Sequence, residues 1–148
     1  MRAVKVSLSI EIERPVRELA DFFKSENRAR LWMKDETAKI SISGDGTQPG
    51  DSIEMAKDVN GRTYHASAVV IEYDWPDMVA ISTAVQGTSA LVANSFSEGS
   101  AGTTLWQLDK LYQFSGLMRL MAPLFRSRLA TADWQAMQEI KGIAEAGA

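Results

Sequence analysis

The sequence contains no cysteine and only one histidine, His65. The lack of cysteine excludes disulfides, thiol catalysis and zinc sites built on cysteine ligands. A Ser-His-Asp triad would have to use His65, because that mechanism needs an imidazole to accept the serine proton. We therefore expect no metal site and no cofactor, and the sequence shows no catalytic signature.

Long apolar runs and a strong charge of one sign are also missing. No run approaches the roughly 20 apolar residues that span a bilayer, and the first residues alternate in polarity, unlike a signal peptide. Sixteen basic and nineteen acidic residues leave a net charge of -3, which gives no bulk attraction to nucleic-acid phosphates. We expect no membrane span, no nucleic-acid partner and a cytoplasmic location.

What is present fits one ordinary globular domain. Hydrophobic residues make up 45% of the chain and charged residues 24%, and 148 residues can bury a core without metals or disulfides. No internal repeat, low-complexity tract or linker divides the sequence. We therefore expect a single domain over residues 1–148.

Apolar residues at every second position predict a strand over residues 4–13 and another over 38–42. Pro15 suits the first position of a helix, and the spacing of apolar residues predicts a short helix that continues to residue 25. A second short helix is expected over residues 28–32, and glycines mark a loop over 44–50, which lacks calcium-ligand spacing.

Turn signals divide the chain up to residue 114 into an antiparallel meander. They lie at Asn60-Gly61, at residues 74–77, at 86–87 and at 98–102. A long helix is then predicted over residues 116–146, with a kink or a break at Pro123. Its expected apolar side consists of Leu117, Leu120, Met121, Leu124 and Phe125, followed by Met137, Ile140 and Ala144.

The Asn60-Gly61 turn predicts the register, because residues opposite each other in a hairpin share a face. It places Ile53 opposite Ala68 and Met55 opposite Ala66 on an inner face, with His65 outside. Several inner residues are small, so a helix across them would leave a cavity. The inner polar residues are Tyr64, Glu72, Asn94, Lys110 and Tyr112.

Three of these inner assignments leave alternatives open. A bulge in residues 69–71, which are apolar on both faces, would turn Glu72 outward. Lys110 is either a buried amine or a side chain that reaches along the hollow to water. Asn94 and Trp106 either satisfy each other's hydrogen bonds or bind the polar end of a ligand.

Several segments resemble one known family. Residues 9–16, with the sequence SIEIERPV, resemble the opening strand and proline-started helix of the START-like or SRPBCC superfamily, in particular its polyketide cyclase/dehydrase and lipid-transport group. Trp32 stands where that group usually has a tryptophan after the second helix. Later matches are Gly50, Gly102-Thr103 and Ile140-Lys141 with Glu145.

The resemblance spans nearly the whole chain and implies an α+β helix-grip fold. In that fold a curved antiparallel sheet of about seven strands wraps around a long C-terminal helix, with two short helices after the first strand. The family includes carriers of hydrophobic molecules, aromatase/cyclases, hormone receptors and proteins that engage a chaperone. Fold alone does not choose among these functions.

Our leading hypothesis is a binding protein that encloses a small hydrophobic or aromatic molecule, lipid-like or polyketide-like, between the sheet and the C-terminal helix. The alternative is a cyclase or dehydratase that uses Glu72, Lys110 or Tyr112 for general acid-base catalysis. The predicted cavity-lining residues are Trp32, Met55, Tyr64, Glu72, Asn94, Phe96, Trp106, Lys110, Tyr112 and Met121.

A third hypothesis is a module that binds a protein partner. The outer face of the central strands has almost no charge, which is compatible with a homodimer surface. Residues 113–132 contain three arginines, Arg119, Arg126 and Arg128, and no acidic residue. This segment is either an ordinary solvated helix face, a docking surface for an anionic partner or the mouth of the pocket.

Overall fold

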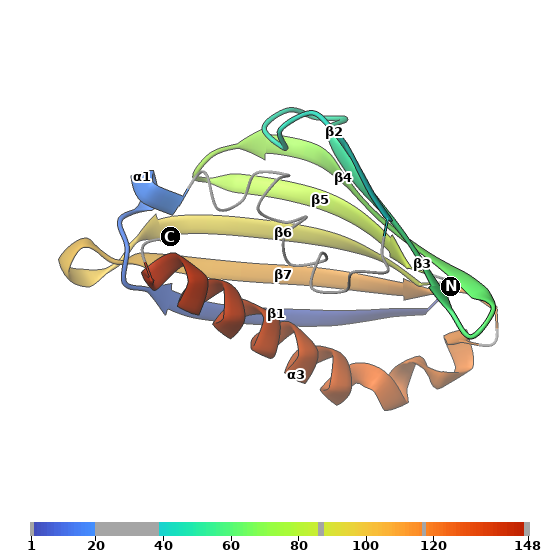
Figure 1. Cartoon of the computed structure of the whole chain (residues 1–148). Coiled ribbons are helices and arrows are strands. Elements are labelled where there is room, and N and C mark those ends of the chain that lie inside the picture. The colour runs from blue at the N-terminus through green and yellow to red at the C-terminus, as the bar shows by residue number, and fades with distance from the viewer. Residues whose placement is uncertain (1, 20–38, 86–87, 117, 147–148) are drawn as a thin grey trace.

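The computed structural model describes residues 2–19, 39–85, 88–116 and 118–146. Its main element is a curved antiparallel sheet with the strand order β1-β7-β6-β5-β4-β3-β2 (Figure 1). The strands are β1 (Arg2–Ile12), β2 (Lys39–Ser43), β3 (Ser52–Val59), β4 (Arg62–Asp74), β5 (Met78–Val85), β6 (Thr88–Glu98) and β7 (Thr104–Phe114). The predicted sheet of about seven strands is confirmed.

Helices connect and cover this sheet. The short α1 (Val16–Leu19) follows β1, a single 3-10 turn, η2 (Ser100–Gly102), joins β6 to β7, and the long α3 (Met118–Glu145) ends the described chain. The first short helix expected after β1 is therefore confirmed over Val16–Leu19, whereas residues 20–25 of that helix and the second helix over residues 28–32 lie outside the described part. Helix α3 is not broken at Pro123.

The β3–β4 hairpin has the predicted register. Asn60 and Gly61 both have positive φ angles, 51° and 79°, as a type I′ turn requires, and glycine adopts such angles without strain. Ile53 accordingly lies opposite Ala68, and His65 opposite Ala56. The alternation of faces predicted from this turn continues through β5, β6 and β7.

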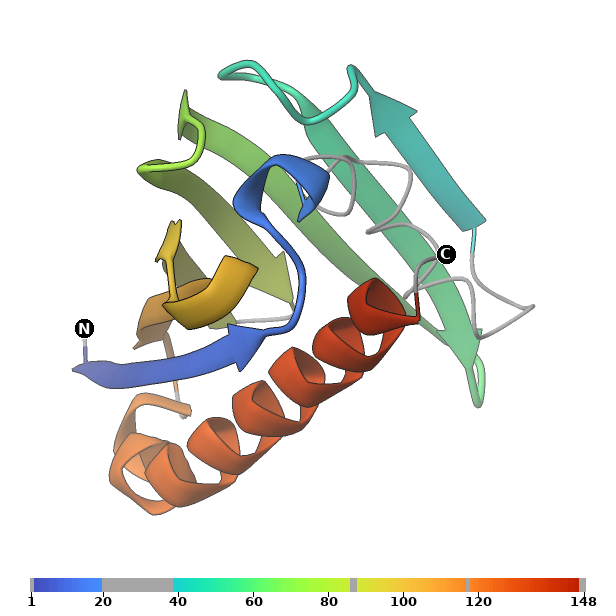
Figure 2. The ribbon, with the colours of Figure 1, turned by 90° about the vertical axis from the view of Figure 1, so that its left-hand side faces the viewer.

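Helix α3 packs chiefly against β1 and to a smaller extent against β7 (Figure 2). Phe125 and Leu129 contact a small cluster formed by Val4 and Phe114. Further along the helix, Met137 belongs to the main core of the sheet. The predicted burial of Met137, Ile140 and Ala144 is borne out, since all three lie in or against that core.

At the beginning of α3 the predicted apolar side was wrong for Leu120 and Leu124, which are 72% and 69% exposed. It was right for Phe125, which packs on the sheet together with Leu129 and is followed by the buried acid Asp133. Leu117 lies outside the described residues. The acidic Asp133 interrupts the apolar pattern of the buried stripe. Apolar periodicity alone therefore favours the exposed side with Leu120 and Leu124.

The C-terminal end of α3 is tied to the end of β1 by Arg14. Its Nε donates to the carbonyl of Ala144 at 3.2 Å, and its Nη2 donates to the carbonyl of Glu145 at 2.9 Å. The backbone N–H of Glu13 also donates to the Glu145 carboxylate at 2.7 Å. The hydrogen bond from Lys141, followed by that from Glu13, holds the pKa of Glu145 below its ordinary value.

Replacement of Arg14 by methionine should lower the free energy of unfolding by about 1–2 kcal/mol. Two carbonyls at the helix end lose their donors, and each typical hydrogen bond contributes about 1 kcal/mol. Urea unfolding of the variant measures this loss. Arg17→Met in α1, where the arginine is exposed, is the matched control and should change stability by less than about 0.5 kcal/mol.

Candidate functional site

The inner face of the sheet has the small residues that the sequence predicted. Ala66 and Ala68 on β4 and Ala90 on β6 are all buried, and Ala68 and Ala90 lie in the main core cluster. Ala90 lies opposite Thr83 on one side and opposite Tyr112 on the other. The small side chains therefore adjoin one of the polar residues predicted to line a cavity.

Asn94 and Trp106 satisfy each other's hydrogen bonds, which settles that alternative. The Trp106 indole N–H donates to Asn94 Oδ1 at 3.0 Å, and Asn94 Nδ2 donates to the carbonyl of Val79 at 3.2 Å. Both side chains are 3% exposed. Phe96 packs beside them, with its ring 5.9 Å from that of Trp106 and 4.6 Å from that of Trp75. Asn94, Phe96 and Trp106 are therefore held in place by contacts within the protein.

A polar cluster joins the inner face to α3. Lys110 Nζ lies 2.7 Å from Asp133 Oδ1, and the Tyr112 hydroxyl is 2.9 Å and 2.8 Å from the two Asp133 oxygens. Lys110 Nζ also lies 3.3 Å from the Tyr112 hydroxyl and 5.4 Å from the centre of its ring. One carboxylate thus accepts hydrogen bonds from a cation and a phenol.

The strands and the helix each supply part of this cluster. Lys110 and Tyr112 are two residues apart on β7, so both side chains stand on the inner face, opposite Val6 and Val4 of β1. Asp133 lies on the side of α3 that packs on these strands. The lysine side chain is 22% exposed and the aspartate side chain 7%. Lys110 therefore neither lies buried alone nor extends freely into water.

The surroundings of Tyr112 keep its hydroxyl protonated. Burial raises the pKa of Tyr112 well above its ordinary value, and the hydrogen bond to Asp133 and the negative charge of that carboxylate raise it further. The protein thus presents, between sheet and helix, one ammonium and one phenol as donors with one carboxylate as acceptor. Such a set can orient the polar end of a ligand or move a proton at it.

Asp133 was missed by the sequence analysis. It is separated from Lys110 by 23 residues, and only the path of α3 over β1 and β7 brings the two together. A signal existed in the spacing, because Asp133 follows Phe125 and Leu129 at intervals of four. An acid at that interval within a buried stripe predicts a buried partner of opposite charge.

Glu72 does not face inward. The register between β4 and β5 shifts between Val70 and Glu72, so Glu72 lies opposite Ala80 and is exposed on the outer face. Tyr73 takes the inward position opposite Val79 and packs against the core. The open alternative, a bulge within the apolar residues before Glu72, is the correct one. An acid-base role of Glu72 inside the fold is therefore excluded.

The remaining predicted lining residues differ in position and exposure. Tyr64 stands on the inner face near the beginning of β4 and is 39% exposed. Met55 is half-buried on β3. Trp32 lies outside the described residues, as does the side chain of Met121.

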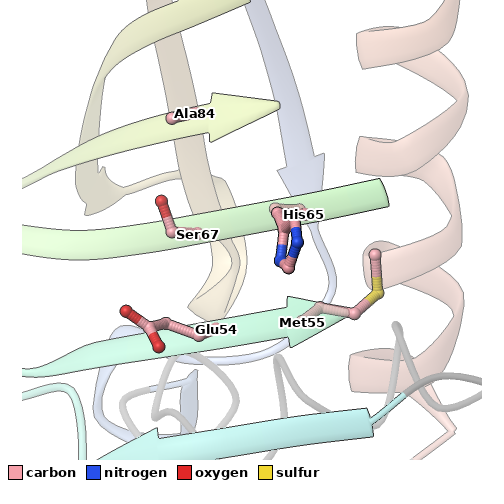
Figure 3. Close-up of a pocket in the computed structure, with 6 residues that line it drawn as sticks. Glu54, Met55, His65, Ser67 and Ala84 are labelled. Atoms are coloured by element: carbon pink, nitrogen blue, oxygen red, sulfur yellow. The ribbon is translucent and has the colours of Figure 1, made fainter. Parts of the chain in front are cut away.

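A hollow of about 380 Å³ lies at β3, β4 and β5, and four of its six lining residues are at outer-face positions, whereas Met55 and Ala66 are at inner-face positions (Figure 3). The Glu54 carboxylate and the Ser67 hydroxyl point away from the His65 ring there. Among the described residues no hydrogen bond joins these three side chains, so they form no triad. The six residues that line the hollow are Glu54, Met55, His65, Ala66, Ser67 and Ala84.

Within the described residues, no group of three or more His, Cys, Asp or Glu side chains is placed to hold a metal ion. In the loop after β2, the Asp51 carboxylate instead accepts the backbone N–H groups of Gly46 and Gln48. No helix of the described chain is long and apolar enough to cross a membrane.

Comparison with known proteins shows the fold. No protein-family model matches the sequence, and no curated protein matches it either. Truncated norcoclaurine synthase from Thalictrum flavum superposes with a TM-score of 0.67 at 13% identity, covering 95% of this chain and 91% of its own. The protein TTHA0849 from Thermus thermophilus has a TM-score of 0.71 at 9% identity, with 97% and 99% covered.

Ara h 8.0201 is a third similar structure, with a TM-score of 0.64 at 12% identity, covering 97% of this chain and 98% of its own. All three structures superpose over nearly the whole of this chain, so the helix-grip fold that the sequence predicts is confirmed. Sequence identities this low indicate a shared fold but not a shared activity. The function must therefore be argued from the residues of this chain.

Proposed function

We propose that this protein binds a small hydrophobic or aromatic molecule between the inner face of its sheet and α3. The observation that carries the proposal is the cluster of Lys110, Tyr112 and Asp133 beside the small residues of β4 and β6. In this arrangement the apolar wall holds the body of the molecule. The Lys110 ammonium has three N–H donors; it gives two of them to Asp133 and to the Tyr112 oxygen, and the third can bind the polar end of the molecule.

Stability alone does not explain why such a cluster is kept. A buried ion pair loses the solvation of both charges, and its replacement by apolar residues is often neutral or stabilising. A cluster of donors and an acceptor in an apolar setting is, by contrast, what a site needs to fix the orientation of a small molecule. Function is therefore the better explanation of the Lys110–Asp133 pair.

Acid-base catalysis in the same place is the second candidate, and the cluster also favours it in one respect. Burial and the neighbouring Asp133 raise the pKa of Tyr112, so its hydroxyl stays a neutral donor to Asp133 and is a poor acid. Because Glu72 lies outside, Asp133 is the carboxylate of this cluster that could accept a proton.

The first measurement is a native mass spectrum of the purified protein. A co-purifying species of defined mass would support the proposal and reveal the class of ligand. Anilinonaphthalene sulfonate, which is aromatic and anionic, is the probe for protein that purifies empty, with binding followed by fluorescence titration.

Ala90→Phe should weaken probe binding by about tenfold or more, which is a loss of about 1.4 kcal/mol. The added ring occupies the space beside Tyr112, whereas Ala93→Phe places the same ring on the outer face of the same strand. The control should leave binding unchanged. Equal binding by Ala90→Phe and the parent protein, with both folded by circular dichroism, would contradict the proposed site.

The double variant Lys110→Met/Asp133→Leu covers the case in which Ala90→Phe fails to fold. It removes both charges together, so no single buried charge remains. We expect it to fold and to bind the anionic probe more weakly than the parent protein does. Full binding by this variant would show that the cluster does not hold the polar end of a ligand.

A further inference from the structure

The first half of α3 presents an apolar stripe to solvent. Leu120 and Leu124 are one helical turn apart and so point the same way, and they are the most exposed large hydrophobic side chains described. On the same side of the helix, at intervals of three and four residues, follow the polar Ser127 and Thr131 and then the aromatic Trp134. Trp134 is itself 36% exposed.

This stripe faces away from the sheet. Phe125 and Leu129, on the other side of the helix, pack against the cluster of Val4 and Phe114. The leucines therefore contribute nothing to that packing. Large apolar side chains exposed to this degree and grouped on one element are typical of a binding surface.

Three exposed arginines lie around the stripe. At about 100° per residue, Arg128 is about 80° from Leu120 on one side, and Arg119 and Arg126 are about 100° and 120° from it on the other, toward the edge of the helix that packs on the sheet. Residues 113–132 contain no acidic residue, although the whole chain has a net charge of -3. The basic charge is thus concentrated at this part of the helix.

We propose that the first half of α3 docks on the surface of an anionic lipid bilayer. The leucines enter the boundary between headgroups and acyl chains while the arginines bind the negatively charged headgroups, as in interfacial amphipathic helices. An indole such as that of Trp134 favours the same boundary, because its ring is apolar and its N–H polar. The contact is weak and reversible, since so few side chains take part.

A protein partner fits this surface less well. A stable protein interface buries about 800 Å² on each side, which requires many more residues than one narrow stripe on a protruding helix. A second copy of the helix would also have to pair at Ser127 and Thr131, which interrupt the apolar contact. A bilayer needs no complementary surface, because lipid headgroups rearrange around the side chains that enter.

Helix α3 begins at the end of the sheet where β6 begins and β7 ends (Figure 1). Val85, Thr88 and Phe114 are aligned in register there, and α3 begins four residues after Phe114. The inner-face residues Tyr64 and Val85 are 39% and 50% exposed, whereas Val79 and Ile81 further along are buried. If the proposed ligand binding holds, docking would bring this end of the site to the membrane. Docking itself does not depend on a ligand.

The test is co-sedimentation of the full chain with vesicles of phosphatidylcholine alone or of an equal mixture with phosphatidylglycerol. We expect binding only to the mixed vesicles, and its loss at high salt. Arg119→Gln/Arg126→Gln should weaken binding about thirtyfold, because each arginine near an anionic surface contributes about fivefold. Leu120→Gln/Leu124→Gln should weaken it at least about tenfold.

Ile143→Gln is the matched control for the leucine variants, because Ile143 is an exposed apolar residue of the same helix outside this surface. Arg17→Gln serves the same purpose for charge. Both controls should bind as the parent protein does, and thermal unfolding should show that every variant is folded.

Three outcomes would overturn the proposal. The first is no binding to the mixed vesicles, and the second is equal loss in the control variants. The third is that the protein does not bind vesicles but either binds poly-glutamate or forms a dimer that the leucine substitutions disrupt. Poly-glutamate binding would point to an acidic protein partner, and the dimer to a second copy of this chain. Loss of ligand binding in Ala90→Phe would leave vesicle binding intact, so the two proposals fail separately.

Discussion

Replacement of Trp106 by alanine is expected to lower the free energy of unfolding by about 4 kcal/mol, within the range for deleting a buried aromatic side chain. Trp106 is 3% exposed and lies opposite Phe96 on β6 and Ile10 on β1. Its removal leaves a cavity in the main core, and it also leaves Asn94 Oδ1 without its donor. Urea unfolding followed by circular dichroism measures the loss.

Two further variants separate packing from hydrogen bonding. Trp106→Phe keeps an aromatic ring but removes the N–H, and should cost about 2 kcal/mol. Leu105→Ala, next to Trp106 but 40% exposed on the opposite face, is the control and should cost less than about 1 kcal/mol. If Trp106→Ala cost no more than Leu105→Ala, the tryptophan would not be part of the core.

The sheet was predictable because one turn and the alternation of side chains determine it. Asn60-Gly61 admits few backbone conformations other than a type I′ turn, and this fixed Ile53 opposite Ala68. A slip by one residue would move the buried apolar side chains of β4, such as Ala68 and Val70, to the outer face, so the register has little freedom. The prediction failed only where that alternation is lost, at the apolar residues before Glu72.

The polar cluster could be predicted only in part. The alternation along β7 placed Lys110 and Tyr112 inside, but it carries no information about the helix that covers them. The face that α3 turns to the sheet depends on packing between elements distant in sequence. The buried position of Asp133 and the exposure of Leu120 and Leu124 have this one cause, because both follow from the rotation of α3 about its axis.

Replacement of Asp133 by alanine should lower the free energy of unfolding by about 3 kcal/mol, near the lower end for breaking a buried ion pair. The Lys110 ammonium and the Tyr112 hydroxyl both lose their acceptor. The lower end applies because the lysine side chain is 22% exposed and can gain water. Asp109→Ala, an acid of the same strand β7 on its outer face, is the control and should cost less than about 1 kcal/mol.

The variant that removes both charges decides what the pair is for. Lys110→Met/Asp133→Leu should recover most of the stability that Asp133→Ala loses, since no unpaired buried charge remains and the volume stays similar. If the double variant regains stability but no longer binds the anionic probe, the ion pair serves ligand binding and is not needed for folding. If the double variant were as unstable as Asp133→Ala, the pair would instead be needed for folding, and the observation that carries the proposed function would lose its force.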